Sequence, residues 1–128
     1  MIRQQFFVEH YWKVIVYLNV DYNFFDNIVK ELEDNELDLD DIKEIYKNMS
    51  TRKAKAVTCS NTKLHTSIVL FNKHNSFIDY LNSVVHEAEH IKQAMLKAYH
   101  IEDRGEAPAY TIGYLVGRMY ITLKRIII

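Results

Sequence analysis

One stretch of the sequence constrains the fold more than any other, because it runs from Ser76 to Arg104 without a glycine or a proline. Ser76 is a suitable N-cap, and Asp79 stands three residues on, in a position like that of a capping box. Apolar residues then recur at three- and four-residue steps, as on one face of an amphipathic helix. They are Phe77, Leu81, Val84, Val85, Ala88, Ile91, Met95 and Leu96. The stretch predicts a long helix that begins at Ser76.

The middle of this predicted helix carries the pentapeptide His86-Glu87-Ala88-Glu89-His90, an HExxH motif. Residues i and i+4 lie one above the other on the same helix face. Two imidazoles can then bind one metal ion, and the Glu beside the first can reach a metal-bound water. The motif indicates a zinc site with its own general base. Two ordinary histidines that fall four residues apart are the simpler explanation, which the sequence leaves open.

A catalytic zinc ion usually has three protein ligands and keeps one position for water. Gly105 ends the preceding segment, and Pro108 is tolerated only in the first turn of a new helix. We therefore expect a second helix from about Glu106 through Leu123, antiparallel to the first or steeply across it. Glu106 is the expected third ligand. An acidic residue at a helix N-terminus is also favourable without any metal, and that alternative stays open.

Two residues between the two helices are weaker candidates for the third ligand, and His100 is excluded. Glu102 and Asp103 lie in the connection, where no helix aims their side chains. His100 follows His90 by ten residues. That spacing is about 15 Å along an intact helix, so His100 cannot share the ion.

The two predicted helices resemble those of a zincin of the glutamate type, and of small HExxH proteins from phages and mobile elements. The matching segments are residues 84–91 and 105–110. The resemblance implies a single zincin-like domain that hydrolyses peptide bonds with Glu87 as general base. The zinc ligands that it implies are His86, His90 and Glu106. Glu89 is expected to be solvated and to pair with Lys92.

Two tyrosines of the second helix are candidates for an auxiliary catalytic role. Tyr110 and Tyr114 follow Glu106 by four and eight residues and share roughly its helix face. Either hydroxyl can donate a hydrogen bond to a developing oxyanion. The commoner role of such tyrosines is packing with a solvated hydroxyl. Residues 126–128 are three isoleucines, expected to be buried in the core or against a second copy in a homodimer.

The first half of the chain predicts the rest of an α+β fold. A strand is expected over 12–20, starting as early as Phe6, with Trp12, Val14, Val16, Leu18 and Val20 on one face. Helices are expected over 23–33 and, capped by Asp38, over 39–49. Strands over 54–60 and 64–72 are expected to form a hairpin. The expected architecture is a small, mostly antiparallel sheet packed on the HExxH helix. The resemblance to zincins implies that an extended substrate adds to an edge strand near the site, for which 64–72 is the candidate; a core strand is the equal alternative for 64–72.

Composition narrows the class of partner. The 128 residues are expected to form one domain, 1–128. A net charge of −1 gives no general attraction to nucleic acid or to an anionic membrane. No apolar run is long enough to span a membrane, and the first residues do not resemble a secretory signal. A reducing cytoplasm is the expected location.

The charged runs and the single cysteine are expected to have structural rather than functional roles. An acidic run over 31–44 and a basic one formed by Arg52, Lys53, Lys55 and Lys63 are expected to be solvated faces. Docking of a charged partner is the alternative. Cys59, the only cysteine, is expected to be a small buried apolar side chain.

These patterns predict a zinc-dependent metallopeptidase that acts on a peptide or protein substrate. Other divalent ions suit the same ligands, because two imidazoles and a carboxylate also bind iron or manganese. The alternative is a non-catalytic protein of the same fold, with or without metal, that acts as an interaction or regulatory module of a mobile element.

Overall fold

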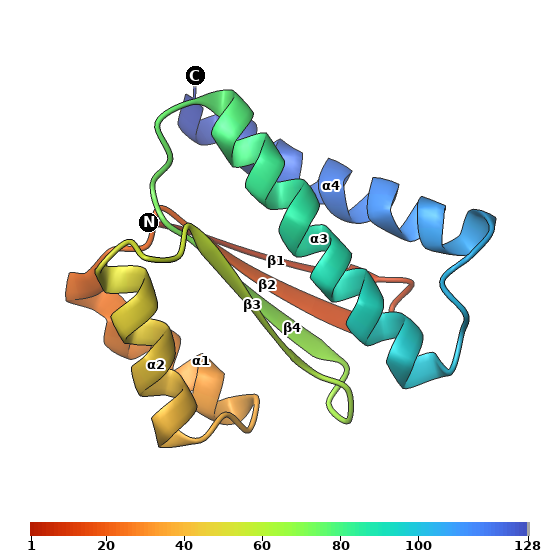
Figure 1. The fold of residues 1–128 in the computed structure, drawn as a ribbon, viewed down its shortest axis with the longest axis horizontal. Helices are drawn as coiled ribbons and strands as arrows, with labels where there is room; N and C mark the ends of the chain where they lie inside the picture. Colours follow the sequence, from red (N-terminus) through yellow and green to blue (C-terminus); the bar gives the residue numbers. More distant parts are fainter. Residues whose placement is uncertain (128) are drawn as a thin grey trace.

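A four-stranded mixed sheet forms the middle layer of the computed structural model, which describes residues 1–127 (Figure 1). The strand order is β1-β2-β4-β3. The outer pairs β1–β2 and β4–β3 are antiparallel, whereas β2 and β4 run parallel. The strands are β1 (Ile2–Val8), β2 (Trp12–Leu18), β3 (Ala56–Asn61) and β4 (Thr66–Phe71). The fold is α+β, as the sequence predicted.

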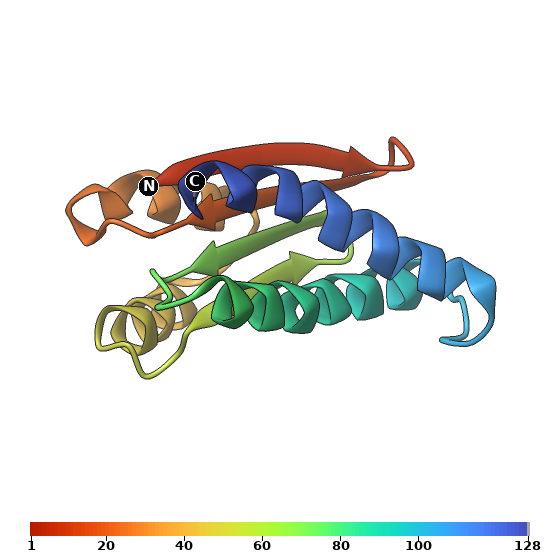
Figure 2. The same ribbon diagram turned by 90° about the horizontal axis from the view of Figure 1, so that it is seen from above.

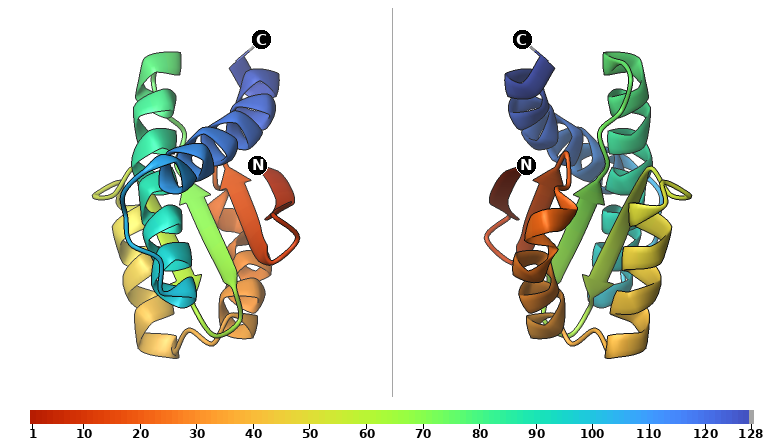
Figure 3. Two further views of the ribbon diagram at one scale, coloured as in Figure 1. Left: turned by 90° about the vertical axis from the view of Figure 1, so that its right-hand side faces the viewer. Right: turned by 90° about the vertical axis from the view of Figure 1, so that its left-hand side faces the viewer.

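Helices cover both faces of the sheet (Figures 2 and 3). One face carries α3 (Phe77–Tyr99) and α4 (Glu106–Ile127). The other carries a short 3-10 helix, η1 (Tyr22–Phe24), followed by α1 (Phe25–Asp34) and α2 (Leu39–Ser50). The core is accordingly divided into two apolar clusters, one on each side of the sheet.

The alternation of β2 places side chains in both clusters. Trp12, Val14, Val16 and Leu18 face α3 and α4, as predicted. Ile15 and Tyr17 face the opposite way and are buried beneath α1 and α2. Val20 lies beyond the end of the strand and joins this second cluster, so its predicted side was wrong.

The N-terminal strand was not recognised in the sequence. The prediction of one strand starting as early as Phe6 is wrong, because the chain reverses between β1 and β2. Glu9 and His10 make the reversal with positive φ angles of 52° and 65°. Neither residue type signals such a turn as glycine or asparagine would. The Tyr11 amide donates to the Val8 carbonyl at 3.1 Å and closes it.

The predicted hairpin of β3 and β4 is confirmed, and of the two alternatives left open for 64–72 the structure shows the core strand, not the edge strand. β4 lies inside the sheet between β2 and β3, and all six of its residues are buried. The free edge beside α3 belongs to β3, whose residues are mostly half-buried. Local patterns do not contain this order, because it depends on the long excursion through α1 and α2 that brings β4 back to β2.

The helix termini follow the predicted caps. Ser76 Oγ accepts from the Asp79 amide at 3.1 Å, and Asp38 Oδ1 accepts from the Asp41 amide at 2.8 Å. α3 ends at Tyr99, earlier than the glycine-free run, with His100 in the left-handed region at φ 57°. α4 begins at Glu106 as predicted and packs across α3 (Figure 1).

The far end of α4 bears on two further predictions. Ile126 is partly buried against the α3–α4 core cluster. The side chain of Ile127 and the whole of Ile128 lie outside the described residues, so burial of the complete tail stays a prediction. Within residues 1–127, no helix combines the length and apolar content needed to cross a membrane.

Candidate metal and catalytic site

The two histidines of the HExxH motif face each other on the surface of α3. Their Nε2 atoms are 3.2 Å apart and their ring centroids 4.8 Å apart. Two nitrogen ligands that each lie about 2.0–2.1 Å from a tetrahedral zinc ion are about 3.3 Å apart. The separation of His86 and His90 therefore suits a shared ion, and it is also that of a hydrogen bond between the two rings. Both rings are exposed, so an ion has access from solvent.

Glu87 is buried beside this pair and is only 4% exposed. Thr58, on the edge strand β3, donates its hydroxyl to Glu87 Oε1 at 2.9 Å. The other oxygen, Oε2, lies 3.9 Å from His86 Nε2. One carboxylate oxygen is thus anchored to the sheet while the other stands beside the imidazoles. This arrangement suits a general base, which must reach the proton that it removes.

A pocket of about 340 Å³ adjoins the motif, between β3 and α3. Lys55 and Ala56 line it from the start of β3, and His86 and Glu87 from α3. Asp79, Asn82 and Ser83 complete the α3 wall one and two turns before the motif. The flank of α3 that carries the catalytic candidates therefore faces the free edge of the sheet.

The structure does not bring Glu106 to the two imidazoles. α4 starts beyond the far end of α3, whereas the motif lies in the middle of that helix (Figure 1). The thirteen residues from His86 to Tyr99 span about 20 Å of helix. Within residues 1–127, no three His, Cys, Asp or Glu side chains lie close enough together to hold a metal ion. Coordination by Glu106 stays a prediction.

The weaker acidic candidates are engaged elsewhere. Lys92 Nζ lies 2.9 Å from Asp103 Oδ2 and 2.9 Å from Glu89 Oε1, which confirms the predicted Glu89–Lys92 pair. Glu102 pairs with Arg104 at 2.7 Å. Lys92 lies about 140° around the helix from Glu87, so it ties the connection to the opposite flank of α3.

Hydrogen bonds lower the pKa of Glu89. The bond donated by Gln93 has the largest effect, and the bond donated by Lys92 has the next largest. It is therefore an engaged anion beside the motif, as expected of a helix-surface glutamate.

The two candidate tyrosines lie near the other edge of the sheet. Tyr110 and Tyr114 line a pocket with Val8 and Glu9, beside the β1–β2 turn. The Tyr114 hydroxyl donates to the Phe7 carbonyl at 3.0 Å, and Tyr110 is 72% exposed. Neither lines the pocket of His86 and Glu87. Their catalytic roles stay predictions that this arrangement does not support.

Cys59 is a thiol, not a reactive thiolate. Burial raises its pKa to about 12, and the charges of Asp41 and Glu87 act in the same direction. The side chain packs against the cluster beneath α1 and α2. This agrees with the predicted small apolar side chain, although Cys59 is half-buried rather than fully buried.

Sequence reasoning missed the partner that fixes the general base. Thr58 carries no local signal, since a threonine in a strand is ordinary. Its importance depends on β3 being the edge strand next to α3, which only the sheet order reveals.

Comparison with known proteins found no protein-family model, no curated protein and no solved structure that matches the chain. The function must therefore be argued from the geometry of the site itself.

Proposed function

We propose that this protein is a zinc-dependent peptidase, with His86 and His90 as metal ligands and Glu87 as general base. One observation carries the proposal: two imidazole nitrogens stand 3.2 Å apart beside a buried carboxylate that the edge strand anchors. A peptide or protein of the reducing cytoplasm is the proposed substrate, in keeping with a chain that has one cysteine.

The residues present fit two of the three protein ligands that a catalytic zinc site needs. When bound, the ion would lower the pKa of a water molecule and polarise the substrate carbonyl. Glu106 can serve as third ligand only if α4 repacks against α3, whereas a water molecule can fill the position with no change in the fold. The donor set also suits iron or manganese.

Glu87 moves the proton in the proposed reaction. Its Oε2 accepts a proton from the attacking water, whose oxygen forms the new bond to the carbonyl carbon. The carbon–nitrogen bond then breaks, and Glu87 returns the proton to the leaving nitrogen. Thr58 keeps the carboxylate in place throughout, because it holds Oε1.

β3 offers a backbone edge along which a peptide can lie. The Asn72 amide donates to the Lys55 carbonyl at 2.9 Å, so Lys55 and Asn72 form a hydrogen-bonded pair of the antiparallel ladder. Because such pairs alternate, the backbone groups of Ala56, Thr58 and Ser60 point away from β4. A substrate strand added there would pass the Glu87 carboxylate, since Thr58 touches it.

A non-catalytic interaction module, with or without metal, is the second candidate. The observation that favours it is the lack, within residues 1–127, of a third metal-binding side chain near His86 and His90. Such a protein would use the same edge strand to bind a peptide without cleaving it. Turnover of peptides, measured with and without a chelator, separates this candidate from the enzyme.

The decisive variant is Glu87→Gln. Removing a general base should lower peptide turnover by about 10²- to 10⁴-fold, while the two imidazoles keep the metal. Glu89→Gln is the matched control, because it alters the neighbouring carboxylate that pairs with Lys92. Loss of metal from Glu87→Gln would show that the role assigned to Glu87 is wrong. A metal-loaded wild-type protein that cleaves no member of a peptide library would favour the interaction module.

A further inference from the structure

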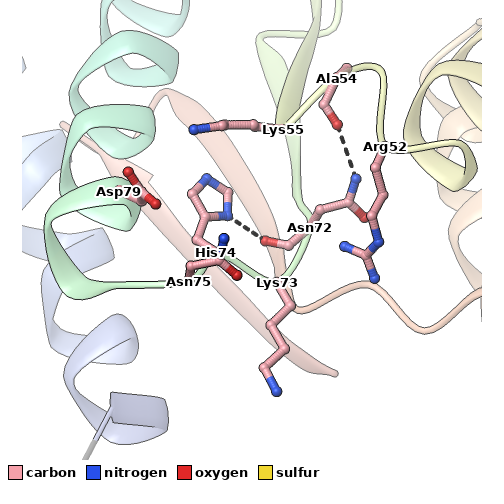
Figure 4. A pocket seen from close by; sticks show the side chains of 8 residues that line it. All are labelled: Arg52, Ala54, Lys55, Asn72, Lys73, His74, Asn75 and Asp79. Atoms are coloured by element: carbon pink, nitrogen blue, oxygen red, sulfur yellow. Dashed lines mark hydrogen bonds between the residues drawn. The ribbon is translucent and has the colours of Figure 1, made fainter.

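A second pocket, of about 420 Å³, lies where β4 ends and α3 begins (Figure 4). Three cationic residues line it from three different segments, and the Lys73 side chain extends away from the other two (Figure 4). Arg52 follows α2, Lys55 precedes β3, and Lys73 follows β4. Within residues 1–127, none of the three forms an ion pair with an acidic side chain. Asp79 is the one carboxylate on its wall, so the basic pocket carries a net positive charge.

Buried polar side chains build the floor of the basic pocket. Asn72 is 3% exposed. Its side-chain amide donates to the backbone carbonyls of Met49 at 2.9 Å and Ala54 at 3.0 Å. His74 is also buried, with ring nitrogens 2.6 Å from the Asn72 carbonyl and 2.7 Å from Ser83 Oγ. Figure 4 shows His74 and Asn72 joined at the centre of the cavity. The floor is therefore fixed by hydrogen bonds, whereas Arg52, Lys55 and Lys73 are exposed side chains around it.

Arg52 occupies its place against a backbone preference. Its φ angle is 60°, in the left-handed region that glycine adopts most easily at the end of a helix. Glu36 and His100 have the same left-handed φ after α1 and α3, so a non-glycine residue of this kind is a common helix end in this chain. The side chain of Arg52 lines the basic pocket.

The basic pocket is continuous with the pocket beside the HExxH motif, because Lys55 and Asp79 line both. A peptide that pairs antiparallel with β3 would point its C-terminus toward Ala56 and hence toward the basic pocket. Asp79 precedes His86 by seven residues, which is about 10 Å along the helix. An extended peptide covers that distance with about three residues.

We propose that the basic pocket binds the C-terminal carboxylate of a peptide laid along β3, so that cleavage falls about three residues from the peptide's end. Arg52, Lys55 and Lys73 supply the positive charge that selects a terminal carboxylate over a neutral chain end. This inference rests on the proposed peptidase function, because it names the substrate class of the same site.

Binding to the inactive Glu87→Gln variant tests the basic pocket separately from turnover. The probes are two hexapeptides of one sequence, one with a free C-terminal acid and one with a C-terminal amide. The acid should bind roughly 10- to 100-fold more tightly at low salt, since its ion pairs are charge-assisted. Added Arg52→Gly should reduce this preference, since Lys55 and Lys73 remain, while leaving the Tm unchanged or higher, because glycine relieves the positive φ. Lys53→Ala is the matched control, since Lys53 does not line the basic pocket, and it should keep the preference.

The outcomes separate this inference from the proposed function. Equal affinities for the acid and the amide peptide would overturn the proposed carboxylate pocket. So would inorganic phosphate that binds at Arg52 without displacing the acid peptide, because the peptide's carboxylate would then lie elsewhere. Mass spectrometry of wild-type digests should find cuts about three residues from the free terminus. Cuts spread along the peptide, and equal in the amide, would overturn the inference and leave the peptidase standing. Selective binding of the acid with no cleavage by metal-loaded wild type would overturn the peptidase and the cleavage position with it.

Discussion

The two edge strands of the sheet, β1 and β3, differ in the contacts that lie beside them. β1 is held by contacts within the chain: Gln4 Nε2 donates to the Arg118 carbonyl at 2.7 Å, and Tyr114 to the Phe7 carbonyl at 3.0 Å. β3 instead lies beside two connected pockets, with Thr58 holding the one buried carboxylate of α3.

This contrast shows that one edge of a sheet can be held by contacts within the chain while the other edge stays accessible to a binding partner. Unprotected edges invite pairing with other chains, so proteins usually cover them or place charge on them. At β1, the Gln4 side chain donates to a backbone carbonyl of α4, and the Arg3 side chain donates to Glu31 of α1. At β3, half-buried strand residues meet a motif helix with paired imidazoles, which is the arrangement expected of a binding edge.

A proline at the free edge of β3 should have the largest effect on peptide turnover. Ala56 is the first residue of β3, and its amide faces the free edge, so Ala56→Pro should fold. The substitution removes one donor to an added peptide strand and should lower peptide turnover about 10-fold or more. Val57→Pro is the matched control. Its amide faces β4, so its loss should cost about 1–3 kcal/mol of unfolding free energy. Unchanged turnover in a folded Ala56→Pro protein would contradict substrate pairing at this edge.

Removing the Thr58 hydroxyl should have the next largest effect. Thr58→Val keeps the shape but leaves Glu87 Oε1 without its donor, so we expect turnover to fall about 10-fold. Tyr114→Phe is the counterpart at the β1 edge and should leave turnover unchanged, because that hydroxyl is donated to Phe7. Steady-state kinetics on one peptide measures both. A fall in kcat for Tyr114→Phe would restore the predicted helper role of that tyrosine.

The smallest effect concerns the ion pair that secures β1 to α1. Arg3 Nε lies 2.7 Å from Glu31 Oε1, and its hydrogen bond lowers the pKa of Glu31 below the ordinary 4.5. A depressed carboxyl pKa stabilises the fold above the unfolded pKa, and that stability is lost as the pH falls through the folded pKa. The contribution is about 1 kcal/mol or less, because the Arg3 side chain is 40% exposed and water screens the pair.

Thermal unfolding from neutral to acidic pH tests this ion pair, with Arg3→Met as the reference. The Tm difference between wild type and variant should be constant above about pH 5 and shrink below about pH 4. A difference that persists unchanged at pH 3 would show that Arg3 acts through packing rather than charge. Tyr17, which also donates to Glu31, stays protonated throughout this range, since its ordinary pKa of 10.0 lies well above it and burial raises that pKa further, to about 12.

Local signals explain which elements the sequence could predict. α3 has an N-cap serine, regular apolar spacing and no interrupting residue, and all of these act within one segment. β1 was missed because Gln4 interrupts its inward-facing apolar residues and the turn after it lacks glycine. Gln4 is accommodated there by the Arg118 carbonyl, more than a hundred residues away.

The residues of the candidate site also divide into those that local sequence signals predict and those that depend on the tertiary fold. His86, Glu87 and His90 could be assigned from spacing, because helix geometry alone places them on adjoining faces. Thr58 and the basic pocket could not, since they depend on β3 lying next to α3 and on the end of β4 meeting the end of α2. The position of Glu106 depends on how far α3 continues past the motif, which the apolar pattern does not limit.

The zinc content of untagged protein, purified without added metal, tests the central claim most directly. Elemental analysis should find about one zinc ion per wild-type chain and a nearly complete loss in His86→Ala and His90→Ala. Glu106→Gln, measured in parallel, shows whether that residue contributes a ligand. A wild-type protein without bound metal, or the same metal content in the two histidine variants, would contradict the account.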